Sequence, residues 1–380
     1  MSSPAGGEGS DPPERTTARR DPDRRTASAG DPPRSSPPSQ RAFDPLPEDL
    51  EALLDPVWLT EALDLVGPGD RVTGVERVDG SRTVAEKVHL RVTVEGPGGR
   101  RRHPLVVKGH FGDGFNSLST EAHAYRDLLP HVGVRAPAAH HVGIDDAGGR
   151  GLVVMDDVLA LGGRILDARV PYSTETCRSS LGQLALLHAR TWGDPRWDVE
   201  WLAPRIAGMA AMFPAEHLQS LLDDGRATGL GPELRDAEVL RAAMCRTAEL
   251  PSTCVLHGDT HSGNAYVTSA GTACWLDWQI AQRGCWAVDV AYHLGTVLDV
   301  EARRSHEGEL LRHYLNELRR HGVDAPDDDE AWDLYTTAFA WAFFLWTITS
   351  ISSREVVLLH VPRIGAAIED HATFSRLGVR

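Results

Sequence analysis

The feature that most constrains the fold is a change in hydrophobic period near Asp157. Before this residue, short valine-rich runs alternate with turn-like segments, which is typical of β-strands. After it, apolar residues recur at helical spacing, most clearly around Leu181, Leu184 and His188. Strands followed by helices predict an α+β protein with a small β-rich lobe and a larger, mainly helical lobe.

The individual elements can be placed by the same patterns. The predicted strands are Arg71 to Val78, Val88 to Glu95, His103 to His110 and Gly151 to Met155. The predicted helices of the first lobe are residues 43–65 and 119–129. In the second lobe a strong strand signal lies between Cys254 and Trp278, in short segments around a turn at 269–271.

The first forty residues consist largely of Pro, Gly, Ser, Asp and Arg. Such a composition buries too little apolar surface to offset the entropy of ordering the chain. It also lacks the apolar run of a signal peptide. We therefore predict a disordered tail over residues 1–42, a first lobe over 43–157 and a second lobe over 158–380.

Charge and cysteine usage restrict the environment and the partners. The chain has 39 Lys and Arg against 54 Asp and Glu, a net charge of -15. This charge disfavours unassisted binding to DNA, RNA or an anionic membrane and suits a neutral or cationic partner. The five cysteines are scattered without a CxxC motif, which favours a reducing cytoplasm and argues against a disulfide framework or structural zinc. We expect a cytoplasmic protein.

The longest apolar stretch runs from Thr336 to Ile351. Its length of about sixteen residues is short of the ~20 residues that a membrane-spanning helix needs. We predict one buried helix for this stretch and no membrane contact, with a membrane helix as the alternative.

The strongest chemical signal is HGDTHSGN, from His257 to Asn264, followed by LDWQ with Asp277. Phosphoryl transfer requires a carboxylate that orients the attacking hydroxyl and two further oxygen ligands for Mg²⁺. Asp259, Asn264 and Asp277 supply these three groups. Asn264 follows Asp259 by five residues, which is the spacing of the protein-kinase catalytic loop.

These segments resemble the motifs of the aminoglycoside phosphotransferase and choline kinase group, small-molecule kinases with a protein-kinase-like fold. Gly258 stands where protein kinases have arginine, and DWQ stands where they have DFG. The later segment AQRGCWAVDVAYHL, with Asp289, resembles the acidic motif that supports the catalytic loop in this group. Within the group, the sequence is most similar to bacterial phosphotransferases of the ecdysteroid and choline kinase-like branch. The resemblance extends from about Val72 to the C-terminus.

The resemblance implies a two-lobed phosphotransferase that uses ATP and Mg²⁺ and acts on a hydroxyl of a small molecule. In this reading Asp259 is the catalytic base or the hydroxyl-orienting group. Asn264 and Asp277 bind Mg²⁺, while His257 and Asp289 support the loop. The acidic net charge is compatible with a cationic acceptor, either aminoglycoside-like or choline-like, and leaves other small hydroxylated compounds open.

Two residues of the first lobe can be paired from the sequence. Lys87 and Lys108 are the only lysines of the chain, and Lys108 ends the predicted strand PLVVKG. Glu121 shares a helix face with Tyr125 and Leu128, where an unpaired carboxylate would be costly to bury. We expect Lys108 to pair with Glu121, and the resemblance implies that this lysine contacts the α- and β-phosphates. The alternative is a surface lysine and a glutamate favoured by the helix dipole.

The remaining nucleotide contacts are expected in a loop and at a hinge. The segment DGSRTVAEK, residues 79–87, takes the place of a glycine-rich phosphate loop although Gly80 is its only glycine. Its predicted phosphate donors are Ser81, Arg82 and Thr83. The strand GLVVM leads into a segment that resembles the adenine-binding hinge, with Met155, Asp156 and Val158 as predicted contacts. An ordinary strand and turn is the alternative.

Two other function classes remain open. His257, Asp259 and His261 stand at alternate positions, as in the zinc cluster of a hydrolase, and His293 and Asp289 could complete it. That interpretation leaves Lys108, Glu121 and Asn264 without a role. The third class is a kinase-like domain that binds nucleotide without turnover.

Overall fold

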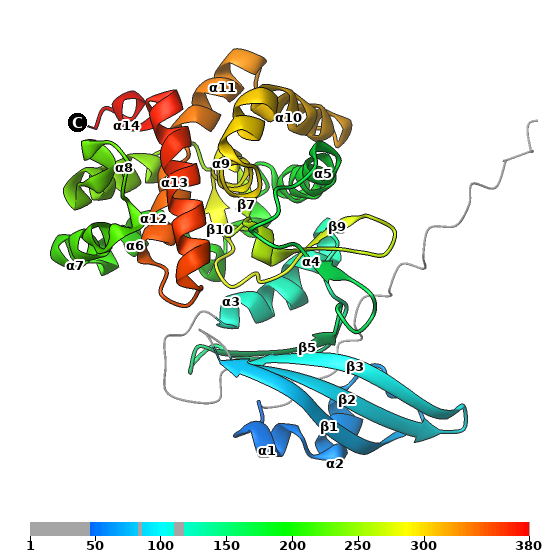
Figure 1. The fold of residues 1–380 in the computed structure, drawn as a ribbon. Helices are drawn as coiled ribbons and strands as arrows, with labels where there is room; N and C mark the ends of the chain where they lie inside the picture. Colours follow the sequence, from blue (N-terminus) through cyan, green and yellow to red (C-terminus); the bar gives the residue numbers. More distant parts are fainter. Residues whose placement is uncertain (1–45, 83–85, 110–117, 380) are drawn as a thin grey trace, which may run out of the picture. The chain divides into compact units, whose positions relative to one another are not determined.

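The computed structural model of the chain describes residues 46–82, 86–109 and 118–379. The predicted tail over residues 1–42 lies outside them. In the described part of the first lobe, five antiparallel strands form one sheet in the order β1-β2-β3-β5-β4 (Figure 1). Their bounds are β1 (Arg71–Arg82), β2 (Glu86–Gly96), β3 (Gly99–Gly109), β4 (Ala139–Asp145) and β5 (Arg150–Asp156).

Alternation along the strands gives the sheet two different faces. Val88, Leu90 and Val92 of β2 are buried in one apolar cluster with α1 (Leu50–Leu53) and α2 (Pro56–Ala62). Val106 of β3 and Met155 of β5 point to the opposite face, where they join the core of the helical lobe. Period-2 patterning therefore places Lys108, two residues after Val106, on the face toward the second lobe.

Two predictions for the first lobe need correction. Residues 43–65 were predicted as one helix, but the described part forms two short helices, because Asp55 caps a new helix and Pro56 occupies its first turn. No strand was predicted between residue 129 and Gly151, yet β4 lies in this segment and pairs with β5. The predicted helix over 119–129 is present as α3 (Leu118–His123), a π-helical turn and α4 (Leu129–Val132).

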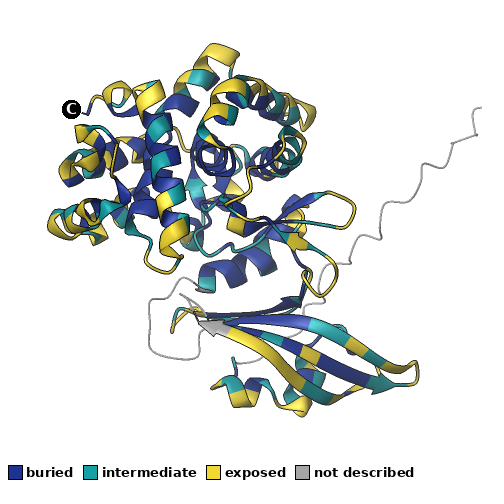
Figure 2. Cartoon of the chain, in the orientation of Figure 1, coloured by how far each residue is buried: buried dark blue, intermediate teal, exposed yellow. Residues whose placement is uncertain are grey.

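The second lobe is mainly helical, which confirms the predicted α+β class. Its helices are α5 (Thr174–Thr191), α6 (Ile206–Met212), α7 (Ala215–Leu221), α8 (Ala237–Ala248), α9 (Trp286–Val297), α10 (Val300–Arg320), α11 (Asp328–Thr337), α12 (Ala340–Ile348), α13 (Arg354–His371) and α14 (Thr373–Arg376). Every residue of α9 is buried, and this helix is dark blue in Figure 2. It is the central helix of the lobe.

Short strands in the second lobe position the motif segments. They are β6 (Arg164–Ile165), β7 (Cys254–Leu256), β8 (Ala265–Val267), β9 (Ala273–Trp275) and β10 (Gln282–Gly284). β8 and β9 pair as a hairpin around the predicted turn at 269–271, and β6 pairs with β8. β7 pairs with β10. The hairpin thus brings the end of HGDTHSGN beside LDWQ.

The apolar stretch from Thr336 to Ile351 is largely buried up to Thr347, but Ile351 is exposed and the stretch is not one helix. α11 ends at Thr337 and α12 begins at Ala340, so a turn at Ala338 and Phe339 divides the stretch. Among the described residues, no helix combines the length and the apolar character needed to cross a bilayer.

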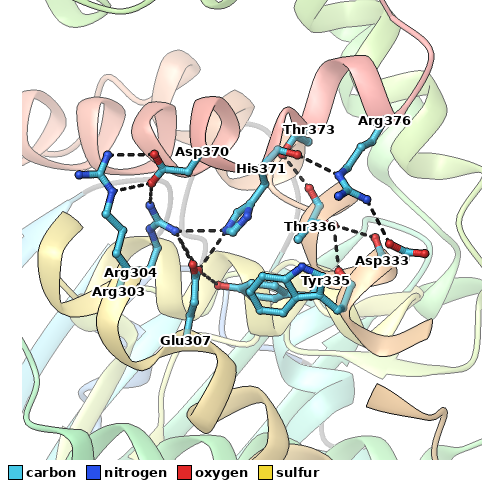
Figure 3. Close-up of polar contacts among 11 residues, drawn as sticks. Arg303, Arg304, Glu307, Asp333, Tyr335, Thr336, Asp370, His371, Thr373 and Arg376 are labelled. Carbon is cyan, nitrogen blue, oxygen red and sulfur yellow. Dashed lines mark hydrogen bonds and ion pairs between the residues drawn. The ribbon is translucent and has the colours of Figure 1, made fainter. Parts of the chain in front are cut away.

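A buried polar network joins the C-terminal helices to α10 and α11 (Figure 3). Arg303 is 1% exposed and forms an ion pair with Glu307 at 2.8 Å, and it also pairs with Asp370 of α13. Tyr335 and His371 contact the same Glu307 oxygen at 2.8 and 3.1 Å. The network satisfies charges that would otherwise be costly in the core.

We expect Arg303→Met to lower the free energy of unfolding by about 3–5 kcal/mol, because it removes the cation that faces a buried carboxylate, that of Glu307. Arg304→Met is the matched control: Arg304 is the next residue and also pairs with Asp370, but it is largely exposed. Urea unfolding should show a large loss for the first variant and little change for the second. Equal losses would assign the stabilisation to Asp370 instead.

Candidate active site

The motif loop begins with a tight turn after β7. Gly258 has a φ of +85°, and a Cβ atom at this residue would lie 2.4 Å from the carbonyl oxygen of Ile280. Both the left-handed backbone and the close approach require glycine. The carbonyl oxygen of Gly258 accepts a hydrogen bond of 2.8 Å from the Trp341 indole of α12.

Asp289, in the first turn of α9, holds the backbone of this loop. Its two carboxylate oxygens accept the amides of His257 and Gly258 at 2.7 and 2.9 Å. Its carbonyl oxygen accepts the Thr260 hydroxyl at 2.8 Å, and His188 of α5 contacts its carboxylate at 3.2 Å. Because Asp289 is fully buried, these bonds form without competition from water.

His257 ties the loop to LDWQ. Its Nε2–H donates to the carbonyl oxygen of Leu276 at 2.8 Å, and its Nδ1 accepts the amide of Asp259 at 3.2 Å. Burial lowers the pKa of His257, so the ring is neutral and both nitrogens are in use. A second bond, from the Leu276 amide to the carbonyl oxygen of Asn264, has a length of 2.8 Å.

The carboxylate of Asp259 is oriented from both sides. Its Oδ1 accepts the Tyr292 hydroxyl of α9 at 2.7 Å, and its Oδ2 accepts Asn264 Nδ2 at 2.8 Å. The Asp259 side chain remains 18% exposed, so it is open to a ligand. Asn264 Nδ2 also donates to the Asp259 carbonyl oxygen at 2.9 Å, which leaves the amide oxygen of Asn264 to face another group.

Lys108 of β3 contacts one carboxylate from each lobe. Its Nζ lies 2.7 Å from Glu121 of α3 and 2.8 Å from Asp277 of the LDWQ segment. Burial alone lowers the pKa of Lys108, but the two carboxylates outweigh burial and hold it above its ordinary value. Burial raises the pKa of Glu121. Burial also favours a higher pKa for Asp277, but Lys108 outweighs burial there and lowers the pKa of Asp277. Lys108 is therefore held as a cation between the two carboxyl groups.

Asp277 adopts a backbone conformation that non-glycine residues seldom use, with a φ of +60°. Aspartate tolerates this left-handed region better than most residues, but at a cost of about 1–3 kcal/mol. Such strain persists where surrounding bonds fix the backbone, and it clusters at ligand sites. Here the bonds of Leu276 to His257 and Asn264 fix the preceding residue.

The predicted hinge residues lie at the end of β5, and several of their groups are already bonded. Met155 is buried, and its sulfur accepts the Tyr125 hydroxyl at 3.4 Å. The Asp156 amide donates to Ala138, and the Asp156 carboxylate contacts His140 at 2.8 Å. Burial lowers the pKa of His140, but its bonds to Asp156 and Asp64 outweigh burial and raise it to about 9.

These bonds restrict how the hinge could contact a base. An adenine at Asp156 must use the carbonyl oxygen, since the amide of this residue is taken. The carbonyl oxygen of Val158 accepts the amide of Gly163 at 2.7 Å. Of the predicted phosphate loop, the backbones of Ser81 and Arg82 end β1 opposite Lys87 and Glu86, and Thr83 lies outside the described residues.

Two residues that hold the loop, Tyr292 and Trp341, were not predicted. Tyr292 follows Asp289 by three residues in α9, so the helical spacing of DVAYHL could have placed both on one face. Trp341 carries no such signal, because it reaches Gly258 from a helix 83 residues away in the chain.

The zinc-cluster alternative loses His257 and His293 as ligands in this geometry. His257 uses both ring nitrogens for hydrogen bonds to the backbone. His293 Nδ1 donates to Thr260 at 2.8 Å and its Nε2 contacts the Ser180 hydroxyl at 2.6 Å. Among the residues that the structure describes, no group of three or more His, Cys, Asp or Glu side chains could hold a metal ion.

Comparisons with known proteins were made on sequence and on structure. Residues 89–332 match the model of the phosphotransferase enzyme family. Similar solved structures include an ethanolamine kinase of Plasmodium vivax, with 12% identity, 79% of this chain and 82% of that chain covered, and a TM-score of 0.47. The choline kinase LicA of Streptococcus pneumoniae has 15% identity, 83% and 97% coverage, and a TM-score of 0.48. The macrolide 2'-phosphotransferase MphH of Brachybacterium faecium has 18% identity, 82% and 98% coverage, and a TM-score of 0.41. No curated protein matches the sequence.

Proposed function

Since the chain belongs to the phosphotransferase enzyme family, we propose that it transfers the terminal phosphoryl group of Mg·ATP to a hydroxyl group of a small molecule. The family and the two-lobed α+β architecture make the chain a small-molecule kinase of protein-kinase-like fold. Nucleotide binding is assigned to residues 43–157, and catalysis and acceptor binding to residues 158–380. We place the reaction in the cytoplasm.

One observation carries the proposal: Lys108 bridges Glu121 and Asp277, while Asp259 stands on a loop bonded to the same LDWQ segment. A lysine held between two carboxylates is pre-positioned for phosphate oxygens, as in other kinases. Asp259, fixed by Tyr292 and Asn264 and partly exposed, can accept a hydrogen bond from an acceptor hydroxyl.

The chemistry follows from these positions. The acceptor oxygen attacks the terminal phosphorus in line, and its proton passes to the carboxylate of Asp259. The bond from that phosphorus to the oxygen bridging to the β-phosphate breaks, and ADP leaves. Lys108 orients the α- and β-phosphates, and Asp289 keeps the loop in the reactive geometry.

Asn264 and Asp277 fit a Mg²⁺ site in their donor chemistry. Mg²⁺ takes one or two protein oxygens and completes its shell with phosphates and water. The Asn264 amide nitrogen is committed to Asp259, so its oxygen is the group left to bind a cation. The Asp277 side chain is 27% exposed and its carboxylate is ionised beside Lys108. When bound, the ion would neutralise charge on the phosphates.

The acceptor we propose is a small hydroxylated compound, with cationic ones such as aminoglycosides and amino alcohols first. The net charge of -15 attracts a cation, although it is spread over the whole chain. Because hydrogen bonds hold the loop in place, we propose that the acceptor hydroxyl binds at the exposed part of the Asp259 carboxylate.

Adding ATP with Mg²⁺ is expected to raise the melting temperature. At a ligand concentration of a hundred times the Kd, binding adds about 2.7 kcal/mol to the free energy of unfolding. Omitting Mg²⁺ should remove most of the shift, and zinc without nucleotide should give little.

A screen of aminoglycosides, amino alcohols, nucleosides and sugars, coupled to ADP release, then identifies the acceptor. A large zinc shift without a response to ATP would instead support a metallohydrolase.

A further inference from the structure

The two lysines of the chain lie side by side in the sheet. Lys87 of β2 is the direct cross-strand partner of Lys108 of β3, and Ser81 of β1 is the partner of Lys87 on its other side. Directly opposed residues of an antiparallel pair have Cα atoms about 4.5–5.5 Å apart and send their side chains to the same face. Both ammonium groups therefore leave the sheet on the face where Lys108 contacts Glu121 and Asp277.

Like charges directly opposite each other destabilise a strand pair, so each of the two ammonium groups requires an anionic partner. Lys108 has two carboxylate partners, Glu121 and Asp277. Lys87 is half-buried and forms no ion pair within the described residues.

The charge balance around Lys108 favours a second cation at this position. Glu121 and Asp277 both pair with Lys108, so this lysine alone offers little net positive charge to a triphosphate. The preceding segment also offers few glycines for a loop of backbone amides around phosphate, because Gly80 is the only one between 79 and 87. A lysine is an effective phosphate ligand that needs no particular loop geometry.

We propose that Lys87 is a second phosphate-binding residue, whose ammonium group contacts the terminal phosphates of the nucleotide beside Lys108. The inference rests on the proposed function and adds a binding residue to it. Lys87 would bind the phosphates that the backbone amides of a glycine-rich loop bind in other nucleotide-binding proteins. Glu121 and Asp277 fix the position of the Lys108 ammonium group. The Lys87 ammonium group has no such partner within the described residues, so it can adjust its position to the phosphates.

The test is calorimetric titration of Mg·ATP and of adenosine into the wild type, Lys87→Met, Lys87→Arg and Arg91→Met. Arg91 is the matched control, because it lies on the same face of β2, roughly 13 Å further along the strand, and pairs with Glu76. Lys87→Met should weaken Mg·ATP binding by about tenfold and leave adenosine binding unchanged. Lys87→Arg should retain most of the affinity, and Arg91→Met should bind as the wild type does.

The outcomes separate this inference from the proposed function. A wild type that binds no Mg·ATP would overturn the proposed function and the inference with it. A wild type that binds Mg·ATP and a Lys87→Met variant that binds it equally well would overturn only the role of Lys87. Loss of adenosine binding together with a lowered urea midpoint in Lys87→Met would also overturn it, since damage to the fold would then explain the loss.

Discussion

Asp259→Asn is expected to lower turnover by about 10²–10⁴-fold, the range for a positioned acid–base group. Asparagine keeps the shape of the side chain and the hydrogen bond from Tyr292, but it cannot take the acceptor proton. Mg·ATP affinity should barely change, because the carboxylate is assigned to the acceptor and not to the phosphates. Steady-state ADP release and nucleotide titration on the same preparation measure the two quantities.

Tyr292→Phe gives the matched control for this prediction. It removes the hydroxyl that orients Asp259 but leaves the carboxylate in place, so turnover should fall much less than in Asp259→Asn. Full turnover in Asp259→Asn would remove this residue from the mechanism. Loss of Mg·ATP binding in that variant would make Asp259 a metal ligand.

Asp277→Asn should produce a different phenotype from the same chemical change. It removes the carboxylate that pairs with Lys108 and that is assigned to Mg²⁺. Hydrogen bonds to charged groups contribute about 1.5–3 kcal/mol, so Mg·ATP affinity should fall by roughly 10- to 150-fold together with turnover. Adenosine affinity should stay near the wild-type value. A variant that loses turnover alone would place Asp277 outside the nucleotide site.

The parts of the fold and site that could be predicted are those encoded locally. The valine-rich runs gave the strands that become β1, β2, β3 and β5, because alternation and turn residues lie within a few positions of one another. The pairing of Lys108 with Glu121 could be predicted because a carboxylate on an apolar helix face needs a cation. The motif loop follows from residue types and spacing alone.

The parts that could not be predicted depend on contacts between distant segments. β4 becomes a strand because β5 offers a free edge for pairing, and its own sequence lacks a strong pattern. The break between α11 and α12 falls inside an apolar run with no proline or glycine to signal it. Trp341 reaches the loop only after the helices have packed.

The complete burial of α9 has a consequence for how the loop can fluctuate. Asp289 and Tyr292 both belong to this helix, and it has no face toward solvent from which local opening could begin. Segments with many buried contacts open only with the cooperative unit that contains them. The loop that carries Asp259 is exposed enough to meet a ligand, but α9, which anchors it, can move away only when the surrounding helices separate. We therefore expect the loop to keep its reactive conformation for as long as the helical lobe stays folded.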